Sequence, residues 1–261
     1  MTSVRNPAVA GLFYPGDPRE LHALVTGYLA NAVAGDVVPK AIIAPHAGYI
    51  YSGPIAASAY ARIQPARGRI TRVILLGPAH RVGFHGLALS SADCFQTPLG
   101  RITVDQEAVK KISALPQVHV MDAAHMQEHS LEVHLPFLQE ALGEFSLVPL
   151  VVGDAGPEEV AEVLEMLWGG PETLIVISSD LSHYHDYKTA QRLDRATSQA
   201  IEHLRLEDIQ YDHACGRNPV NGLLRVARQH GLKAKTVDLR NSGDTAGSHD
   251  RVVGYGAYVF E

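Results

Sequence analysis

Residues 174–185 read LIVISSDLSHYH, where an apolar run passes directly into serine, aspartate and histidine. Similar apolar runs occupy residues 41–44, 73–76, 147–152 and 254–260. Apolar runs of this length, without polar alternation, predict strands that are covered on both faces of a sheet. The sequence therefore predicts a central sheet that is buried between two layers.

Helical patterns lie between these strands. They span residues 17–33, 53–63, 157–167, 187–204 and 220–230. Asp17 can cap the first of them, and Pro18 fits its first turn. Alternation of strands and helices predicts an α/β fold, in which a mixed, largely parallel sheet is flanked by helices. We expect a single domain over residues 1–261.

Composition excludes several classes of function. The 261 residues include 22 Lys and Arg against 28 Asp and Glu, a net charge of −6, and no basic run. This charge disfavours nucleic acid and anionic membranes as partners. Two cysteines, Cys94 and Cys215, are too few for a disulfide framework. Because we find neither a membrane-spanning run nor a signal peptide, we expect a cytoplasmic protein.

Histidine is the residue type that stands out, with 14 copies. Predicted strands are followed by His46, by His80, by Asp180 and His183, and by Asp244. Ligands of open α/β sheets bind in the crevice beyond the carboxyl ends of the strands. We therefore expect these side chains to converge in one crevice.

Two histidines and a carboxylate that leave coordination positions open are typical of non-haem Fe(II) sites. We expect His46, His80 and Asp244 to bind the metal. Fe(II) is the predicted ion, and the same groups also accept zinc or copper. The sequence does not distinguish between iron and zinc as the bound metal.

Three further residues are predicted to assist this site. His183 is expected to act as a base, since an imidazole exchanges protons near neutral pH. Asp180 and Glu132 are expected to fix the orientation of the imidazoles. On a helix, His125, His129 and Glu132 would share one face.

Several of these residues also have structural interpretations. Asp180 can cap a helix, and Gly243-Asp244 can be an ordinary turn. Cys215 can be a buried filler or, with Arg217 favouring the thiolate, a reactive thiol in the crevice. Nucleotide-binding loops and the nucleophile elbow GxSxG are missing from the sequence.

A set of six motifs resembles the Memo family. The motifs are NPAVAGLFYP (6–15), APHAGY (44–49), LGPAH (76–80), EHSLEVHLP (128–136), SSDLSHY (178–184) and CGR (215–217). Together with residues 241–245, they cover essentially the whole chain. The resemblance is carried by the number and the order of the motifs.

The resemblance implies an α/β fold akin to the class III extradiol, iron-dependent dioxygenases. It also implies a place in the AmmeMemoRadiSam set, in which bacterial and archaeal members accompany a radical-SAM protein and an AMMECR-type protein. Animal members are linked to cell motility and to iron or copper binding.

Site residues follow from the same resemblance. His46 and His80 match the family's ligand histidines, and His183 matches the catalytic base of the dioxygenases. Animal members carry a ligand cysteine in the segment that here reads Asn241-Ser242-Gly243-Asp244-Thr245. Asp244 is the expected substitute, which favours Fe(II) over thiolate chemistry. Cys215 lies in a different motif.

Three functions stay open at this point, and with them the question of whether the protein is an enzyme. The first is a metal-dependent, oxygenase-like oxidoreductase that acts on a small molecule. The second is a binding or scaffold protein that takes a peptide or phosphopeptide, with Arg217, Arg240 or the histidines meeting the anion. The third is a zinc hydrolase in which His183 moves protons.

Overall fold

A central parallel sheet gives the molecule its frame in the computed structural model, which describes residues 2–261. Met1, the first residue of the predicted domain 1–261, lies outside the described residues. The centre of the sheet consists of β2 (Ala41–Ala44), β9 (Thr173–Ser178), β3 (Arg72–Pro78) and β8 (Ser146–Val152). These four strands run parallel to one another. Their carboxyl ends therefore meet at one edge.

Antiparallel pairs extend the sheet on both sides. Next to β2 lies β12 (Val252–Phe260), which also pairs with β11 (Ala234–Asn241) and β10 (His183–His185). On the other side, β8 pairs with β4 (Leu87–Leu89), and β4 pairs with β7 (Val118–Val120). The predicted mixed, largely parallel sheet is confirmed, as are the five predicted strands.

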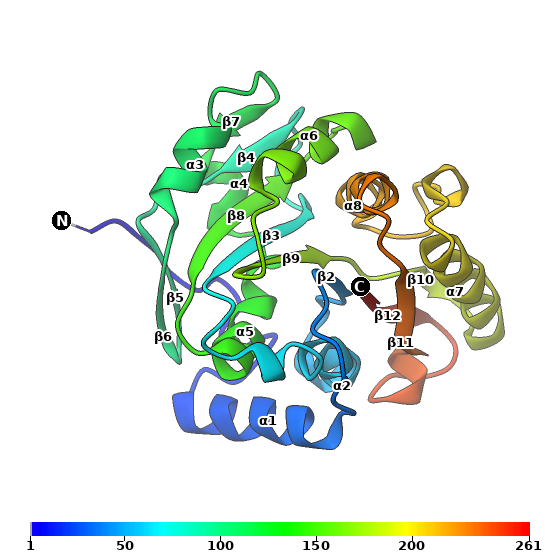
Figure 1. The fold of residues 1–261 in the computed structure, drawn as a ribbon. Coiled ribbons are helices and arrows are strands. Elements are labelled where there is room, and N and C mark those ends of the chain that lie inside the picture. Colours follow the sequence, from blue (N-terminus) through cyan, green and yellow to red (C-terminus); the bar gives the residue numbers. More distant parts are fainter. Residues whose placement is uncertain (1) are drawn as a thin grey trace.

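Helices cover both faces of this sheet (Figure 1). One layer is α1 (Pro18–Asn31), α2 (Tyr49–Tyr60) and α5 (Leu135–Leu142). The other layer contains α3 (Gln106–Ile112), α6 (Pro157–Leu167), α7 (Tyr187–Glu202) and α8 (Arg217–Gln229). Alternating residues of β2 serve the two layers, since Ile42 packs in the core on the α1 side and Ile43 in the core on the α8 side.

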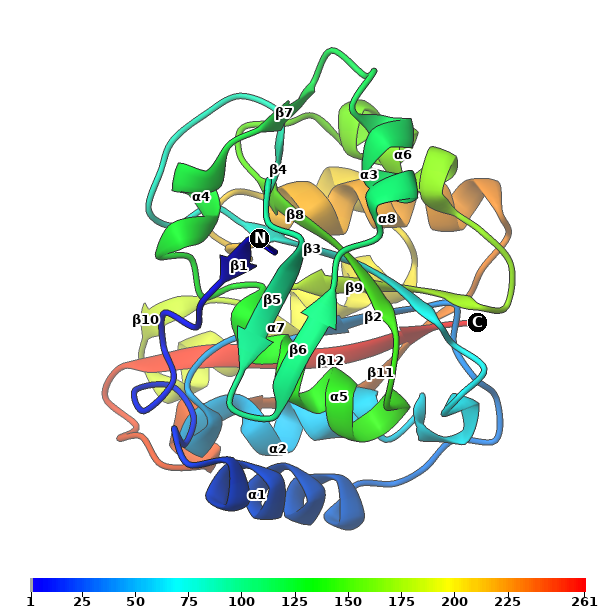
Figure 2. The same ribbon diagram turned by 90° about the vertical axis from the view of Figure 1, so that its left-hand side faces the viewer.

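Short elements complete the fold. A small second sheet, seen from outside in Figure 2, contains β1 (Val4–Arg5), β5 (Cys94–Thr97) and β6 (Gly100–Thr103). The remaining helices are one α-helical turn and four 3₁₀ turns: α4 (Asp122–Met126), η1 (Gln64–Ala66), η2 (Glu132–His134), η3 (Leu206–Asp208) and η4 (Ser242–Asp244). Among residues 2–261, no helix combines the length and the apolar character that crossing a bilayer requires.

The segment with the clustered histidines departs from the prediction. No single helix carries His125, His129 and Glu132, because α4 ends at Met126 and η2 begins only at Glu132. Glu128 explains the interruption: its Oε1 atom accepts hydrogen bonds from the backbone N–H groups of His129 and Ser130. A carboxylate that takes these donors competes with helical hydrogen bonds.

Candidate metal centre

A cavity of about 950 Å³ opens at the carboxyl ends of β2, β3 and β9. His46, His80 and Asp180 line it from the turns that follow these strands, His183 lines it from β10, and Cys215 from the loop before α8. The strand-end argument thus placed four of these five groups in one crevice. Cys215 reaches the crevice from a loop.

His46 presents one ring nitrogen to the crevice. Its side chain is 2% exposed, and its Nδ1 atom lies 2.6 Å from Ser178 Oγ. Ser178 Oγ donates its own proton to the carbonyl of Ser130 at 2.6 Å, so it can only accept from His46. Nδ1 of His46 therefore carries the proton, and Nε2 keeps a free lone pair. Burial lowers the pKa of His46 well below its usual value, as do neighbouring histidines, and this keeps the ring neutral.

His80 is oriented in the same way by Glu128. Its Nδ1 atom lies 2.9 Å from Glu128 Oε1, and its backbone N–H donates to Oε2 at 2.6 Å. Burial raises the pKa of Glu128, but hydrogen bonds from His80 outweigh this and lower it to about 2. The carboxylate is therefore an acceptor, so Nδ1 of His80 carries a proton and Nε2 is the ring nitrogen that faces away from this bond. The sequence analysis did not predict this role for Glu128, although Glu128 precedes His129 in the motif EHSLEVHLP.

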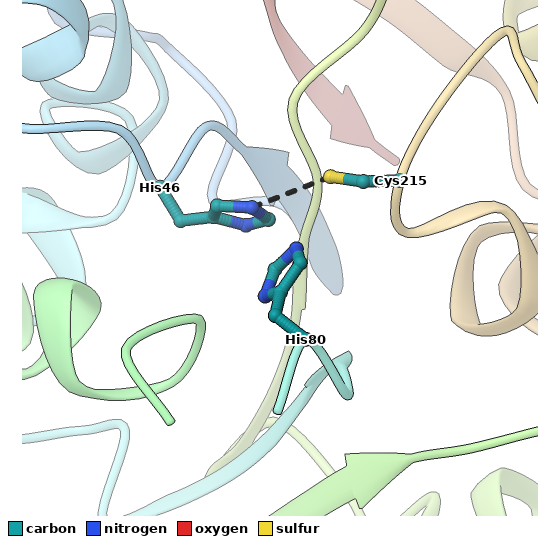
Figure 3. A group of neighbouring side chains, drawn as sticks. All are labelled: His46, His80 and Cys215. Carbon is teal, nitrogen blue, oxygen red and sulfur yellow. Dashed lines mark hydrogen bonds between the residues drawn. The ribbon is translucent and has the colours of Figure 1, made fainter. Parts of the chain in front are cut away.

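Cys215 supplies the third group. Its Sγ atom lies 3.3 Å from Nε2 of His46, and Figure 3 shows the thiol and the two imidazoles pointing toward one another. Burial raises the pKa of the thiol, and the nearby Asp180 raises it further. Without a metal the thiol is protonated and donates to the free lone pair of His46. Arg217 does not favour the thiolate, because its guanidinium binds Asn218 Oδ1 and lies over the ring of Tyr211.

These three groups fit a transition-metal ion. One ligand atom from each of His46, His80 and Cys215 lies within 4.8 Å of the other two. An ion with metal–nitrogen bonds of about 2.0 Å, a metal–sulfur bond of about 2.3 Å and tetrahedral angles separates nitrogen from sulfur by roughly 3.5 Å. The observed 3.3 Å between Nε2 and Sγ is close to this separation. Ser178 and Glu128 supply the outer hydrogen bonds that metal-binding histidines need.

Asp244 does not join this group, which corrects the predicted ligand set. Its Oδ2 atom accepts from the backbone N–H of Asn241 at 2.8 Å, and its Oδ1 atom accepts from the Tyr187 hydroxyl. It lines a separate small pocket beside Asn241 and Arg240. The strand β11 does end at the crevice, where Ser242 is a lining residue. The side chain of Asp244 turns back because it caps η4.

Asp180 and His183 lie in the crevice, where proton transfer is possible. Asp180 Oδ1 accepts from the backbone N–H of His46 at 2.8 Å, and Oδ2 lies 3.8 Å from His46 Nε2. Burial raises the pKa of Asp180 to about 7, although the hydrogen bond from His46 opposes this. Burial lowers the pKa of His183, so its imidazole is neutral at pH 7.

Glu132 lies outside the crevice, and its contacts are with the N-terminal segment of the chain. It forms a buried ion pair with Arg5 and accepts hydrogen bonds from the backbone of Ala8 and Val9 and from the Tyr14 hydroxyl. These contacts fasten the N-terminal segment to the domain. The predicted role of Glu132 in orienting an imidazole finds no contact in the structure.

His129 joins the crevice as a neighbour of the candidate ligands. Its ring stacks on His80 at 4.7 Å between centroids. His80, Glu128 and His129 also form a second group of close donor atoms. Glu128 Oε1 already accepts from His80 Nδ1 and from two backbone N–H groups. These bonds suit an orienting role for Glu128 better than direct metal ligation.

Buried histidines away from the candidate ligands make the fold sensitive to acid. His134 is bonded through Nδ1 to the Tyr60 hydroxyl at 2.7 Å, and burial lowers its pKa from 6.5 to about 3. Burial also lowers the pKa of His125 to about 4. The unfolded chain takes up protons below about pH 6.5, whereas the folded chain does not, so stability falls as the pH falls.

We therefore expect His134→Gln to flatten this dependence. Each buried neutral histidine contributes a slope of up to about 1.4 kcal/mol per pH unit between the two pKa values. Urea unfolding at pH 7, 6, 5 and 4 measures the slope, with the exposed His119→Gln as control. Equal slopes for His134→Gln and wild type would contradict the assignment.

Comparisons with known proteins find relatives over nearly the whole chain. Residues 5–259 match the family model described as Memo-like protein. A MEMO1 family protein of Aquifex aeolicus is 39% identical over 268 residues, covering 98% of this chain and 99% of the relative. A MEMO1 family protein of Ignicoccus hospitalis is 34% identical and covers 98% of both chains.

The fold is also found among solved structures. The crystal structure of uncharacterized protein JW3007 from Escherichia coli K12 aligns with a TM-score of 0.51 and 13% identity. The alignment covers 82% of this chain and 98% of that chain. At this identity the likeness concerns the fold alone.

Proposed function

The chain belongs to the Memo-like protein family, and from this premise we propose that its crevice is the active site of a metal-dependent oxidoreductase acting on a small molecule. The observation that carries the proposal is the convergence of His46, His80 and Cys215, whose donor atoms face one another at distances that an ion fits. A cavity of about 950 Å³ has the size of small-molecule sites.

The metal would be held by the Nε2 atoms of His46 and His80 and by Sγ of Cys215. A redox-active ion there would supply electron exchange with oxygen. Iron(II) is the proposed ion, and copper and zinc are the competitors, since imidazole accepts all three and sulfur favours the softer ions. Metal binding would displace the thiol proton of Cys215, which makes affinity rise with pH.

The chain's own groups would handle protons and orientation. His183, neutral at pH 7, would accept a proton from a substrate hydroxyl. Asp180, with a pKa of about 7, would take or return a proton beside His46. Ser178 and Glu128 would hold the two imidazoles in the ligating tautomer.

The two alternative functions receive less support. The phosphopeptide scaffold relied on Arg217, Arg240 or the histidines to meet the anion. Arg217 is bound to Asn218, Arg240 is paired with Asp238, and neither arginine lines the crevice, which leaves only the histidines for this role. A zinc hydrolase would use the same ligands and differs in the ion alone. Association with radical-SAM and AMMECR-type proteins, and a cytoplasmic location, stay predictions.

Metal analysis of anaerobically purified protein tests the ligand set. We expect Cys215→Ser to lower metal affinity by at least about 100-fold, because it removes a proposed ligand and loss of an outer-shell partner alone costs about 10–100-fold. Asp244→Asn is the matched control and should bind like wild type. Weakened metal binding in Asp244→Asn, together with wild-type binding in Cys215→Ser, would contradict the proposed ligand Cys215 and support Asp244, the ligand predicted from the sequence.

Oxygen uptake tests the reaction. Iron-loaded protein, incubated with fractionated small molecules from cell extract, should consume oxygen with at least one fraction. The variant His183→Ala should keep its metal and lose this uptake. Full metal occupancy without uptake on any fraction would contradict the oxidoreductase proposal, and ester or amide cleavage by the zinc-loaded protein would favour the hydrolase.

A further inference from the structure

At the mouth of the crevice lie two arginines that form no ion pair with a carboxylate of residues 2–261. Arg81 and Arg251 are both exposed and both line the cavity. The arginine ion pairs within residues 2–261 are formed by other residues, namely Arg5, Arg72, Arg205, Arg225, Arg228 and Arg240. Two cations at the opening of a cavity attract anions and hold them through charge-assisted hydrogen bonds.

Tyr184 lies beside one of these arginines in an unusual conformation. It has a φ of 63°, in the left-handed region that non-glycine residues rarely adopt, and it occupies the irregular register of β10 between His183 and His185. Its ring is on the surface, 64% exposed, with the Arg251 guanidinium 5.1 Å from the ring centroid. Such strain persists at sites where a side chain has to be held in a functional position.

The other residues that line the cavity indicate which kind of anion it binds. Aromatic rings of Phe13, Tyr51 and Tyr255 also line the cavity, which suits a flat ring. Asp180 on the inside and the exposed Asp212 at the rim offset part of the positive charge. These two carboxyl groups repel an anion, and they repel a doubly charged phosphate monoester more strongly than a singly charged carboxylate.

We propose that the crevice binds an aromatic carboxylate, with the carboxylate on Arg251, further attraction from Arg81, and the ring against Tyr184. This inference rests on the proposed function, since it names the substrate class of the same site. Arg251 acts as the group that recognises the anion, and the ring of Tyr184 holds both the guanidinium and the ligand's flat face.

Calorimetry with matched probes tests the proposal on the full chain. The probes are 4-hydroxybenzoate and its neutral analogue 4-hydroxybenzamide, with phenyl phosphate as a third arm. We expect 4-hydroxybenzoate to bind about tenfold more tightly than the amide, and Arg251→Gln to abolish this preference. Arg19→Gln, an exposed arginine of α1 outside the crevice, is the matched control and should keep the preference.

Tyr184→Gly separates recognition from folding. Glycine adopts a φ of 63° without strain, so the variant should unfold at the wild-type temperature or above it. We expect its affinity for 4-hydroxybenzoate to fall about tenfold, because the aromatic contact is lost. Unchanged affinity in this variant would contradict the role of the ring.

The outcome distinguishes this inference from the proposed function. Wild-type protein from which the metal has been removed with a chelator should keep the preference for the carboxylate. Equal binding of the first two probes, tighter binding of phenyl phosphate, or no binding of any probe at millimolar concentration would each overturn the aromatic-carboxylate proposal. None of these results would bear on the metal content, which tests the proposed function separately.

Discussion

Replacing His46 or His80 by alanine should lower metal affinity by at least about 100-fold, because each change removes a ligand and not merely an outer-shell partner. Glu128→Gln should show an intermediate loss of about tenfold, since the amide holds the His80 ring less firmly. Competition between the protein and a chromogenic chelator, with zinc and with iron(II) under anaerobic conditions, measures these affinities.

The control for these variants is His119→Gln, which removes an exposed imidazole outside the crevice. It should bind metal like wild type. Thermal unfolding of each metal-free variant shows whether the fold is retained. If His46→Ala and His80→Ala are folded and bind metal as tightly as wild type, the crevice is not the metal site.

Glu132→Ala should destabilise the fold by about 3–5 kcal/mol, the usual effect of removing one partner from a buried ion pair. The change leaves the guanidinium of Arg5 buried without its carboxylate and strands the N–H groups of Ala8 and Val9. Urea unfolding measures the loss. If the alanine variant does not fold, Glu132→Gln should show the same direction with a smaller loss.

Metal binding by these variants separates a structural role from a role in the site. Because Glu132 contacts the N-terminal segment and not the crevice, the folded fraction should bind metal with wild-type affinity. Wild-type stability together with weakened metal binding would instead support the role in orienting an imidazole that the sequence predicted for Glu132.

The strands and their ends were predictable because their signals are local. The apolar run 174–177 is buried on both faces in β9, and the polar residues after it enter the crevice. The same reasoning brought His46, His80 and His183 to one edge of the sheet. The carboxyl ends of parallel strands lie at the same edge of a sheet, so the residues that follow them are brought close together.

The proximity of Cys215 to His46 and His80 could not be predicted in this way. Residues after β11 do reach the crevice, where Ser242 is a lining residue, but Asp244 is taken by the cap of η4. Cys215 lies next to His46 only because the loop before α8 folds over the ends of β2 and β9, a contact between residues 169 positions apart. The sequence shows the CGR motif, but it does not show that Cys215 of this motif lies next to His46.

The prediction of one helix over residues 125–132 failed because a side chain takes hydrogen bonds that the helix would need. The spacing of His125, His129 and Glu132 fits one helical face, but Glu128 takes the backbone donors at the turn. The three side chains then diverge: His125 bonds to the carbonyl of Ala88, His129 stacks on His80, and Glu132 pairs with Arg5.

X-ray absorption of the metal-loaded protein tests the central claim most directly. Our account expects one sulfur at about 2.3 Å and nitrogen neighbours at about 2.0–2.1 Å from the ion, with the sulfur signal lost in Cys215→Ser and kept in Asp244→Asn. A shell of nitrogen and oxygen alone in the wild-type protein would contradict it.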